Sequence, residues 1–482
     1  MSHVVVIGSG PAGLAAAERL ASEGVRVTLA TMGHHLGGKA SSWRDRTTGR
    51  VVEHGQHVMM GFYDEMRALL RRSGVDLART AYDTDYRFVI WEERDQRAHH
   101  LHFEDGPLRM IFEGFKYTGM SLGEKLNFFG VLVQGMAELA AGVPEELDDT
   151  CLSAWCLERG LSPEFMQTAI FRCSREAQLN WPGEISAYAM LKTLAVAGRD
   201  YTTSEYRLPA GGMSEIWWEP VARRIESLGG SVRRHMKLTG IEVENGRLVA
   251  LRLAPPLPHP PERPYFEGVV PTDPAAEERW TDFDAAILTL PPAALAEIMP
   301  PELLAIPELS GVPRLSTVAP LGLHAWHRAS VTQGPRTVVA GLGNPLGFVV
   351  DNKPVYPEYR DDPSIGAALH FVGQETGFED DDDETLLDRC LASVRRIPGW
   401  GGFDREGVLQ FTVVRSRLAA RRYWNAEPGS LRHKPQAQTP VAGLFLGGDW
   451  IRTPLDFPCM ENAVRGGRIA AKHCLDFIGA NT

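Results

Sequence analysis

The first chemistry that the sequence offers is phosphate binding near its amino terminus. The run GSGPAG spaces its glycines as G-x-G-x-x-G, directly after a short β-branched run and at the start of a predicted helix, 11–23. In such a unit the first glycine allows a tight turn, the second lets a pyrophosphate approach, and the third packs helix on strand. The helix start adds N–H groups and a positive dipole. A glycine-rich turn without a ligand is the alternative. The predicted dinucleotide-binding residues are Gly8, Gly10, Pro11, Ala12 and Gly13.

The residue expected to hold a ribose is unusual. Thr31 stands eighteen residues after Gly13, where an aspartate or glutamate usually accepts hydrogen bonds from ribose hydroxyls. A threonine makes one neutral bond, weaker than a charged one by roughly half. It could also leave room for a 2′-phosphate, but no arginine follows among residues 32–35 to clamp one. Loss of nucleotide binding is the third possibility.

A second glycine pair bears on this choice, because Leu36 is followed by Gly37, Gly38 and Lys39 just past the second predicted strand. Here the chain resembles the superfamily of FAD-dependent amine oxidases and carotenoid desaturases. That superfamily has a G-G-[RK] motif whose backbone approaches the FAD pyrophosphate. The resemblance implies FAD as the cofactor, with the adenosine ribose at Thr31 held by a neutral hydroxyl, backbone groups or water.

The resemblance extends over nearly the whole chain. Residues 53–74 are similar to the segment leading to the flavin ring in plant-type phytoene and ζ-carotene desaturases. LPAGGMSEI resembles the P-x-G-G-M loop, FDAAILTLP the returning strand, and LFLGGDW with PCMENAVRGGRIAA the carboxy-terminal signature. Asn462 departs from the family, which usually has glycine there. The further cofactor-binding residues that the resemblance implies are Gly55, Gln56, His57, Leu238 near adenine, Gly448, Asp449 at ribityl or phosphate oxygens, and Met460 and Glu461 at the start of a helix facing the flavin pyrimidine.

The chemistry that the resemblance implies is hydride transfer from a substrate C–H bond to flavin N5, with loss of a neighbouring proton. His57 and Arg207 are placed near the ring by this resemblance. His57 could shuttle a proton, or it could make only a structural hydrogen bond. Arg207 could anchor a polar group of a substrate or quinone, or it could be a solvated loop arginine.

The substrate class follows from one position and one region. Amine oxidases of the superfamily often carry an aromatic residue before their MEGA motif, as half of a cage around the amine, and this chain has Cys459 there. Residues 147–191 are similar to the substrate region of carotenoid desaturases. The predicted function is therefore desaturation of an apolar isoprenoid or polyene by an FAD-dependent oxidoreductase. The alternatives are an amine or amino-acid oxidase in a biosynthetic pathway and a non-redox, isomerase-like flavoprotein. Oxygen and a quinone both remain possible electron acceptors.

The elements that must position these residues predict an α/β fold. Apolar strands lie near both ends and in the middle of the chain, a hairpin is expected to turn at Asn245-Gly246, and a last helix is expected over 460–475. We predict a Rossmann-like FAD-binding domain of the GR2 type, interrupted by a mixed α+β substrate-binding domain with a helical insertion. The FAD-binding domain is assigned 1–82, 206–292 and 441–482, and the substrate-binding domain 83–205 and 293–440.

The composition excludes some other classes of function. The net charge of −11 disfavours a nucleic-acid partner, which needs a basic face. The six cysteines form no C-x-x-C pair and are typical of reduced thiols. No secretory leader or membrane-spanning run is evident, so we expect a cytoplasmic protein.

Two smaller features leave alternatives open. His100 and His102 share a strand face, but no third ligand is evident and we predict no metal. The aromatic and basic segment 108–119 could lie on the inner face of a membrane, where a lipid-soluble substrate would enter, or form a lid over the pocket. The oligomeric state is left open.

Overall fold

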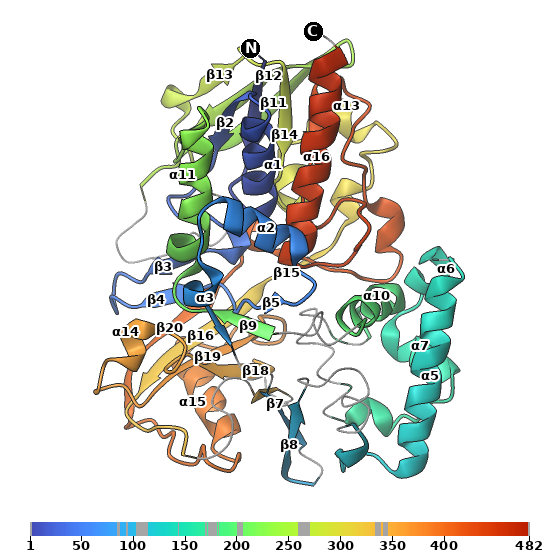
Figure 1. Cartoon of the computed structure of the whole chain (residues 1–482), viewed down its shortest axis with the longest axis vertical. Coiled ribbons are helices and arrows are strands. Elements are labelled where there is room, and N and C mark those ends of the chain that lie inside the picture. Colours follow the sequence, from blue (N-terminus) through green and yellow to red (C-terminus); the bar gives the residue numbers. More distant parts are fainter. Residues whose placement is uncertain are drawn as a thin grey trace.

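Three distant segments of the chain meet in one parallel sheet in the computed structural model, with both termini at the same end of the molecule (Figure 1). Every pairing in this sheet is parallel. Its strands, in spatial order, are β10 (Ser231–Arg233), β2 (Arg26–Ala30), β1 (His3–Ile7), β14 (Ala285–Leu288) and β22 (Leu444–Leu446). The structure describes residues 2–83, 87–92, 95–102, 114–142, 144–168, 171, 181, 183–199, 206–258, 270–332, 339–340 and 346–480.

Two helices from opposite ends of the chain cover this sheet side by side: α1 (Pro11–Ser22) and α16 (Met460–Ala480) (Figure 1). The approach is close because small residues face each other. A Cβ atom on Gly467 would lie 2.0 Å from the carbonyl oxygen of Ala12, so only glycine fits there. The carboxy-terminal helix is thereby fixed directly above the amino-terminal glycine turn.

The predicted hairpin is confirmed. Strand β11 (Lys237–Glu244) pairs antiparallel with β12 (Arg247–Ala254), and β13 (Glu278–Trp280) extends this sheet. Asn245 and Gly246 between them have φ angles of 51° and 73°, the left-handed conformation of a two-residue hairpin turn. The pairing is irregular between Leu238 and Gly240, at the end of the hairpin next to the parallel sheet.

A second, larger sheet lies on the far side of the glycine turns from α1 and α16. Seven strands follow the order β20-β16-β19-β18-β17-β7-β8, and α15 (Asp383–Val394) packs on β16 and β20. Their bounds are β7 (Arg87–Glu92), β8 (Arg97–His102), β16 (Pro320–His327), β17 (Val339–Ala340), β18 (Phe348–Asp351), β19 (Ala367–Gln374) and β20 (Val408–Arg415). Two small sheets lie between the parallel sheet and the seven-stranded sheet (Figure 1). One pairs β3 (Ser42–Arg44) with β4 (Val51–Glu53), and the other has the order β5 (Met59–Met60), β9 (Tyr206–Pro209) and β6 (Ala81–Asp83).

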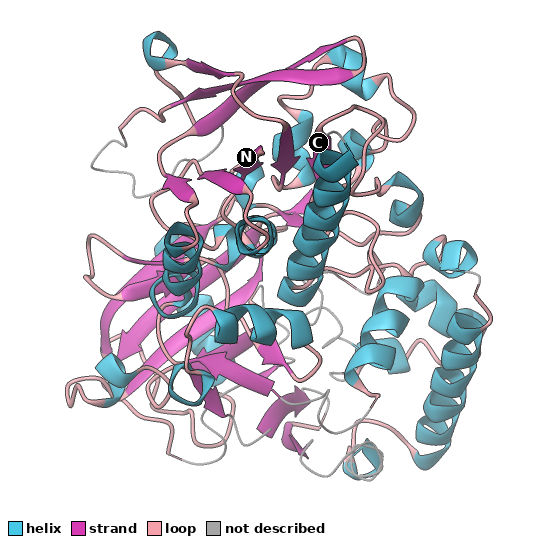
Figure 2. Ribbon diagram, turned by 45° about the horizontal axis from the view of Figure 1, so that its top comes forward, coloured by secondary structure: helices cyan, strands magenta, loops and turns pink. Residues whose placement is uncertain are grey.

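The expected helical insertion stands apart from the strands (Figure 2). It consists mainly of α5 (Leu122–Ala140), α6 (Pro144–Asp148), α7 (Leu152–Glu158) and α10 (Ala187–Ala197). Helix α5 begins with a capping box, in which Ser121 and Glu124 each bond the other's backbone N–H. Within the described residues, no helix combines the length and the apolar character needed to cross a membrane.

Two predictions about organisation stay open. The division of the chain into an FAD-binding domain and a substrate-binding domain remains a prediction. The segment 108–119, considered as a membrane contact or a lid, falls largely outside the described residues.

Candidate functional site

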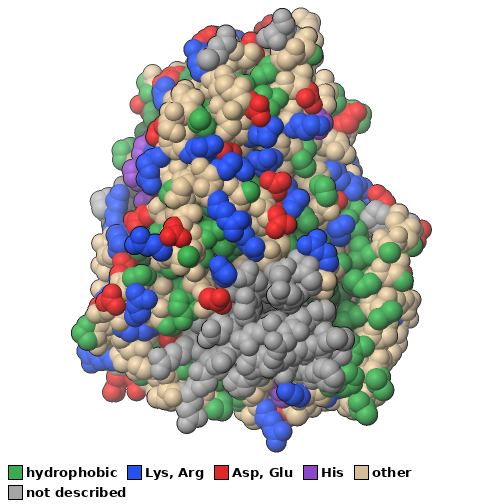
Figure 3. All heavy atoms as spheres, in the orientation of Figure 1, with side chains coloured by type: hydrophobic (Ala, Val, Ile, Leu, Met, Phe, Trp, Pro, Cys, Tyr) green, Lys and Arg blue, Asp and Glu red, His purple; other side chains and the backbone are tan. Residues whose placement is uncertain are grey.

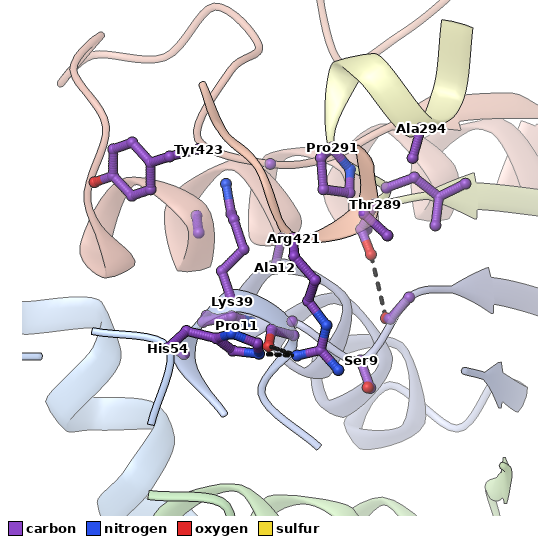
Figure 4. Close-up of a pocket in the computed structure, with 18 of the residues that line it drawn as sticks. Ser9, Pro11, Ala12, Lys39, His54, Thr289, Pro291, Ala294, Arg421 and Tyr423 are labelled. Carbon is purple, nitrogen blue, oxygen red and sulfur yellow. Dashed lines mark hydrogen bonds between the residues drawn. The ribbon is translucent and has the colours of Figure 1, made fainter. Parts of the chain in front are cut away.

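A cavity of about 320 Å³ opens at the carboxyl ends of β1 and β2, beneath α12 (Pro292–Ala296) and the segment 418–421 (Figure 4). The carboxyl edge of a parallel sheet is where such folds bind ligands. The predicted site residues that line the cavity are Gly8, Gly10, Pro11, Ala12, Thr31, Gly38, Lys39, Gly55, Gln56, His57, Leu238, Gly448, Asp449 and Met460. Those that do not line it are Gly13, Gly37, Arg207 and Glu461.

The first glycine turn has room for a ligand in one place and none in another. A Cβ atom on Gly10 would meet nothing within 4 Å, whereas one on Gly13 would lie 1.8 Å from the carbonyl oxygen of Gly8. Gly10 therefore leaves space for a ligand, and Gly13 lets α1 pack on β1. The first turn of α1 carries no acidic residue and no side-chain cap, so its N–H groups face the cavity without a competing carboxylate. This arrangement fits an anionic group such as a pyrophosphate.

The second glycine pair rests directly on the first turn. Gly37 has a φ of 109°, and a Cβ atom there would lie 2.5 Å from Trp218. A Cβ atom on Gly38 would lie 3.1 Å from the Cα of Gly10. The two glycine turns thus touch through backbone atoms, and together they form one wall of the cavity.

The position predicted to hold the ribose has a pair of neutral hydroxyls. The Oγ1 of Thr31 and the Oγ of Ser9 lie 2.7 Å apart and are buried. The Thr31 backbone is fixed by its N–H, which donates to the carbonyl of Arg233. One hydroxyl of the pair donates to the other, so one O–H group is left to meet a ligand. The sequence suggested Thr31 but gave no sign that Ser9 would pair with it.

An ion pair lies between the second glycine turn and the carboxy-terminal signature. The Lys39 Nζ atom is 3.7 Å from an oxygen of Asp449, and both residues line the cavity. The same Nζ lies 5.0 Å from the ring centroid of Tyr423. Lys39 therefore balances the Asp449 charge beside the place predicted for phosphate or ribityl oxygens.

Arg421 is a site residue that the motifs did not reveal. Its guanidinium donates to the Gly38 carbonyl and to the Ser41 hydroxyl, both at 3.0 Å, and it also contacts His54 Nε2 (Figure 4). Burial and the Arg421 charge hold the pKa of His54 well below its usual range. Arg421 places a positive charge beside the glycine cradle from a segment almost 400 residues away in the chain, and no local motif marks it.

Two residues of the carboxy-terminal signature point away from the cavity. The Asn462 side chain donates to the carbonyls of Asp449 and Phe457, both at 2.9 Å, and is fully buried. The Glu461 carboxylate accepts the backbone N–H groups of Glu65 and Met66, at the start of α2 (Asp64–Arg72). The departure from glycine at Asn462 is thus accommodated behind the site. The prediction for Glu461 depends on its backbone rather than its carboxylate, whose pKa is raised by burial.

The two candidate catalytic residues are placed differently. His57 lines the cavity, and its Nδ1 lies 3.8 Å from the Glu53 carboxylate. Arg207 lies on β9 between β5 and β6, where its backbone faces Met59 and Asp83. The geometry thus favours His57 over Arg207 as a residue that meets a substrate.

Two tyrosines lie beside Cys459, the residue whose type argued against an amine cage from the sequence. Tyr63 and Tyr423 line the cavity with Cys459, and burial raises both tyrosine pKa values well above normal, helped at Tyr423 by the Asp449 charge. Burial likewise raises the pKa of Cys459. Two tyrosines are therefore available near the site even though the residue before Met460 is a cysteine.

A metal site has no support in the described residues. They contain no group of three histidine, cysteine, aspartate or glutamate side chains that could hold an ion. The side chains of His100 and His102 lie outside the described part of the chain.

Comparison with known proteins identifies the family. Flavin-containing amine oxidoreductases match residues 11–475. The chain belongs to this family. The flavoprotein is 23% identical, over 477 residues, to a 15-cis-phytoene desaturase from Synechococcus elongatus, covering 98% of this chain and 95% of that protein. It is 26% identical to a carotenoid phi-ring synthase from Streptomyces griseus, covering 98% and 87% of the two chains.

Solved structures show the same fold. A putrescine oxidase variant superposes on this flavoprotein with a TM-score of 0.72 at 16% identity, covering 100% of this chain and 99% of the other. Reduced UDP-galactopyranose mutase gives 0.66 at 14% identity, covering 99% and 94%. The predicted superfamily, the Rossmann-like α/β fold and an FAD-dependent oxidoreductase are confirmed. The open cradle at Gly10, with α1 N–H groups aimed into it, fits the FAD pyrophosphate.

The glycine turn gives a prediction that separates binding from folding. Gly10→Val places a side chain in the space for pyrophosphate, so we expect an FAD Kd at least about tenfold higher, equivalent to about 1.4 kcal/mol, with little change in the melting temperature of the apoprotein. Gly13→Val, which clashes with the Gly8 carbonyl, should instead lower that melting temperature. Flavin fluorescence titration and thermal melts measure the two effects. Equal FAD affinity in Gly10→Val would contradict the cradle.

The hydroxyl pair gives a second prediction. Thr31→Val removes one member, so we expect FAD to bind about fivefold more weakly, equivalent to about 1 kcal/mol. Thr31→Glu restores the acid common at this position, so we expect FAD binding to tighten or stay unchanged. Isothermal titration of the apoproteins with FAD measures both, with Thr48→Val as a control outside the cavity. Abolished binding in Thr31→Glu would show that Thr31 does not lie at the ribose.

Proposed function

We propose that this flavoprotein desaturates an apolar isoprenoid or polyene. The observation that carries the proposal is the continuation of the cavity beyond the glycine turns onto the seven-stranded sheet. Its lining there includes Pro320, Phe348 and Val372 of that sheet, together with Val58 just before β5, and these side chains offer an apolar hydrocarbon surface rather than charged anchors. The relatives named as phytoene desaturases, which match almost the whole chain, support the same substrate class.

The residues that line the cavity indicate which part of the reaction the cofactor would perform and which part the protein would perform. FAD supplies the hydride acceptor when it is bound. The glycine turns hold its phosphates, Lys39 and Arg421 supply positive charge beside them, and the apolar wall orients a hydrocarbon chain and keeps water away. His57 borders the same space and is the titratable group that we propose meets the substrate.

Oxidation of an amine is the second candidate. Tyr63 and Tyr423 flank Cys459 in the cavity, and a pair of aromatic rings can hold an amine by cation–π attraction. The structural likeness to putrescine oxidase shows the fold alone and does not decide between the two substrates.

Anaerobic titration tests the two candidates directly. We expect phytoene, delivered in detergent micelles or vesicles, to bleach the flavin absorbance, because the apolar wall binds hydrocarbon next to the cofactor. Putrescine and other simple amines should leave the spectrum unchanged. Re-oxidation of the reduced protein by oxygen or by a quinone, measured in parallel, identifies the electron acceptor. Hydrogen peroxide released with an amine would overturn the desaturase assignment.

We also propose that the protein works in the cytoplasm against the inner face of a membrane, which would supply such a substrate. Helix α5 exposes Leu122, Leu126 and Val133 by 64%, 59% and 70%, and this spacing puts them on one face. Hydrophobic side chains gather over this helical part of the surface (Figure 3). An exposed apolar stripe on a helix suits contact with lipid.

Vesicle flotation tests this contact. The double variant Leu126→Glu with Val133→Glu puts charge on the stripe, so we expect at least a severalfold lower fraction bound to vesicles. Leu228→Glu, at an exposed leucine on the end of α11 (Glu219–Ser227), serves as the matched control and should bind like the unmodified protein. Equal flotation of all three proteins would exclude α5 as the contact.

A further inference from the structure

A buried carboxylate with few partners lies behind the cavity. Glu53 ends β4 and is 1% exposed. No N–H group donates to its side-chain oxygens, and the Tyr356 hydroxyl lies against them as a hydrogen-bond donor. Burying an ionised carboxylate is costly unless another charge compensates it. The chain therefore retains at Glu53 a charge that stability alone would not select.

The residue nearest to this charge borders the cavity. His57 follows Glu53 by four residues, and its Nδ1 lies 3.8 Å from a Glu53 oxygen. That Nδ1 is also buried without a hydrogen bond, while the His57 side chain is 19% exposed and lines the cavity. The imidazole thus bridges from the buried carboxylate to the space where substrate would lie.

The other ionisable groups around the pair are held uncharged. Burial lowers the pKa of His54 and His370 well below normal, and lowers that of His324 to about 4. These rings come from the segment after β4 and from β16 and β19. Tyr356 has its pKa raised well above normal, first by burial, then by the Glu53 charge, and also by a hydrogen bond from its hydroxyl to Glu53.

Two charged groups complete the surroundings. The Arg421 guanidinium contacts His54 Nε2 and donates to the carbonyl of Gly38 in the second glycine turn. The negative charge of Asp45 opposes the lowering of the His324 pKa by burial. Of the four histidines in this cluster, His57 is the one that both pairs with Glu53 and lines the cavity.

We propose that Glu53 and His57 together form the proton-accepting pair of the reaction. Glu53 is a positioning residue whose negative charge turns Nδ1 of His57 toward it and stabilises the protonated ring. His57 Nε2 takes the proton from the carbon next to the one that loses hydride. The hydride carries two electrons to FAD, and the electron pair of the second C–H bond becomes the new C=C bond. This inference rests on the proposed dehydrogenation, which supplies the departing proton.

The direct test is the ¹⁵N NMR spectrum of the labelled imidazoles in the FAD-loaded protein, with the His57 signals assigned by their loss in His57→Gln. The two ring nitrogens differ in chemical shift according to which one carries the proton. In Glu53→Gln the negative charge beside Nδ1 is gone, so we expect the His57 Nδ1 signal to move. Glu53→Asp keeps the charge and should move that signal less. An unchanged His57 spectrum in Glu53→Gln would overturn the pairing.

A matched control comes from another buried carboxylate. Glu375 is 3% exposed and bonds Arg415 and Arg417. Glu375→Gln should leave the His57 ¹⁵N signals unchanged and lower the melting temperature, because it removes the negative charge that pairs with Arg415 and Arg417. Glu53→Gln should keep or raise the melting temperature, since it removes a buried charge and keeps an acceptor for the Tyr356 hydroxyl. A marked loss of stability in Glu53→Gln would show that Glu53 is structural and would overturn its proposed role.

The rate of flavin reduction links the pair to turnover. Flavin reduction by phytoene should be slower in His57→Gln and in Glu53→Gln than in the unmodified protein, and Glu53→Asp should retain more of the rate than Glu53→Gln. An unchanged rate in Glu53→Gln would overturn the role of the pair in catalysis. If phytoene reduces none of these proteins while the NMR shift is present, the substrate proposal fails and the Glu53–His57 pairing stands.

Discussion

The contact between two backbone turns is the constraint on which the rest of this structure depends. Gly10 and Gly38 meet without side chains, so backbone groups that follow the carboxyl ends of β1 and β2 border one cavity. Side chains at these points would fill the space that a pyrophosphate needs. The close approach also fixes what surrounds it, since Arg421 bonds the Gly38 carbonyl and Gly467 lets α16 lie against α1.

The residues that line the cavity change from polar and charged around the glycine turns to apolar on the seven-stranded sheet. At the predicted ribose position the structure offers neutral hydroxyls from Ser9 and Thr31, whereas Lys39 and Arg421 bring positive charge beside the glycine turns predicted to hold the phosphates. Past the glycine turns the lining becomes apolar, with Glu53 buried behind it. Such a lining suits the proposed pairing of an anionic cofactor with an apolar substrate, because the positive charges lie beside the glycine turns and the apolar side chains lie beyond them.

The departure from the family pattern at Asn462 does not change the cavity lining, because residues behind the cavity bond its side chain. Asn462 replaces a glycine, yet its amide bonds two backbone carbonyls of the preceding loop and so fixes the start of α16. Glu461 caps α2 in the same way and joins the last helix to the segment that carries His57 toward the cavity. A motif residue can therefore serve the site by holding the backbone in place while its side chain points elsewhere.

The sequence by itself determined the features whose physics is local. Strand, glycine turn and helix at the amino terminus, and the hairpin at Asn245-Gly246, follow from backbone preferences of a few adjacent residues. The order of the family motifs led from there to FAD. Only the tertiary structure decided that Ser9 pairs with Thr31, that Arg421 reaches the glycine turn, that Arg207 stands outside the cavity lining and that histidines from distant strands surround Glu53. These contacts join residues far apart in the chain, and their energies depend on burial, which a linear pattern does not contain.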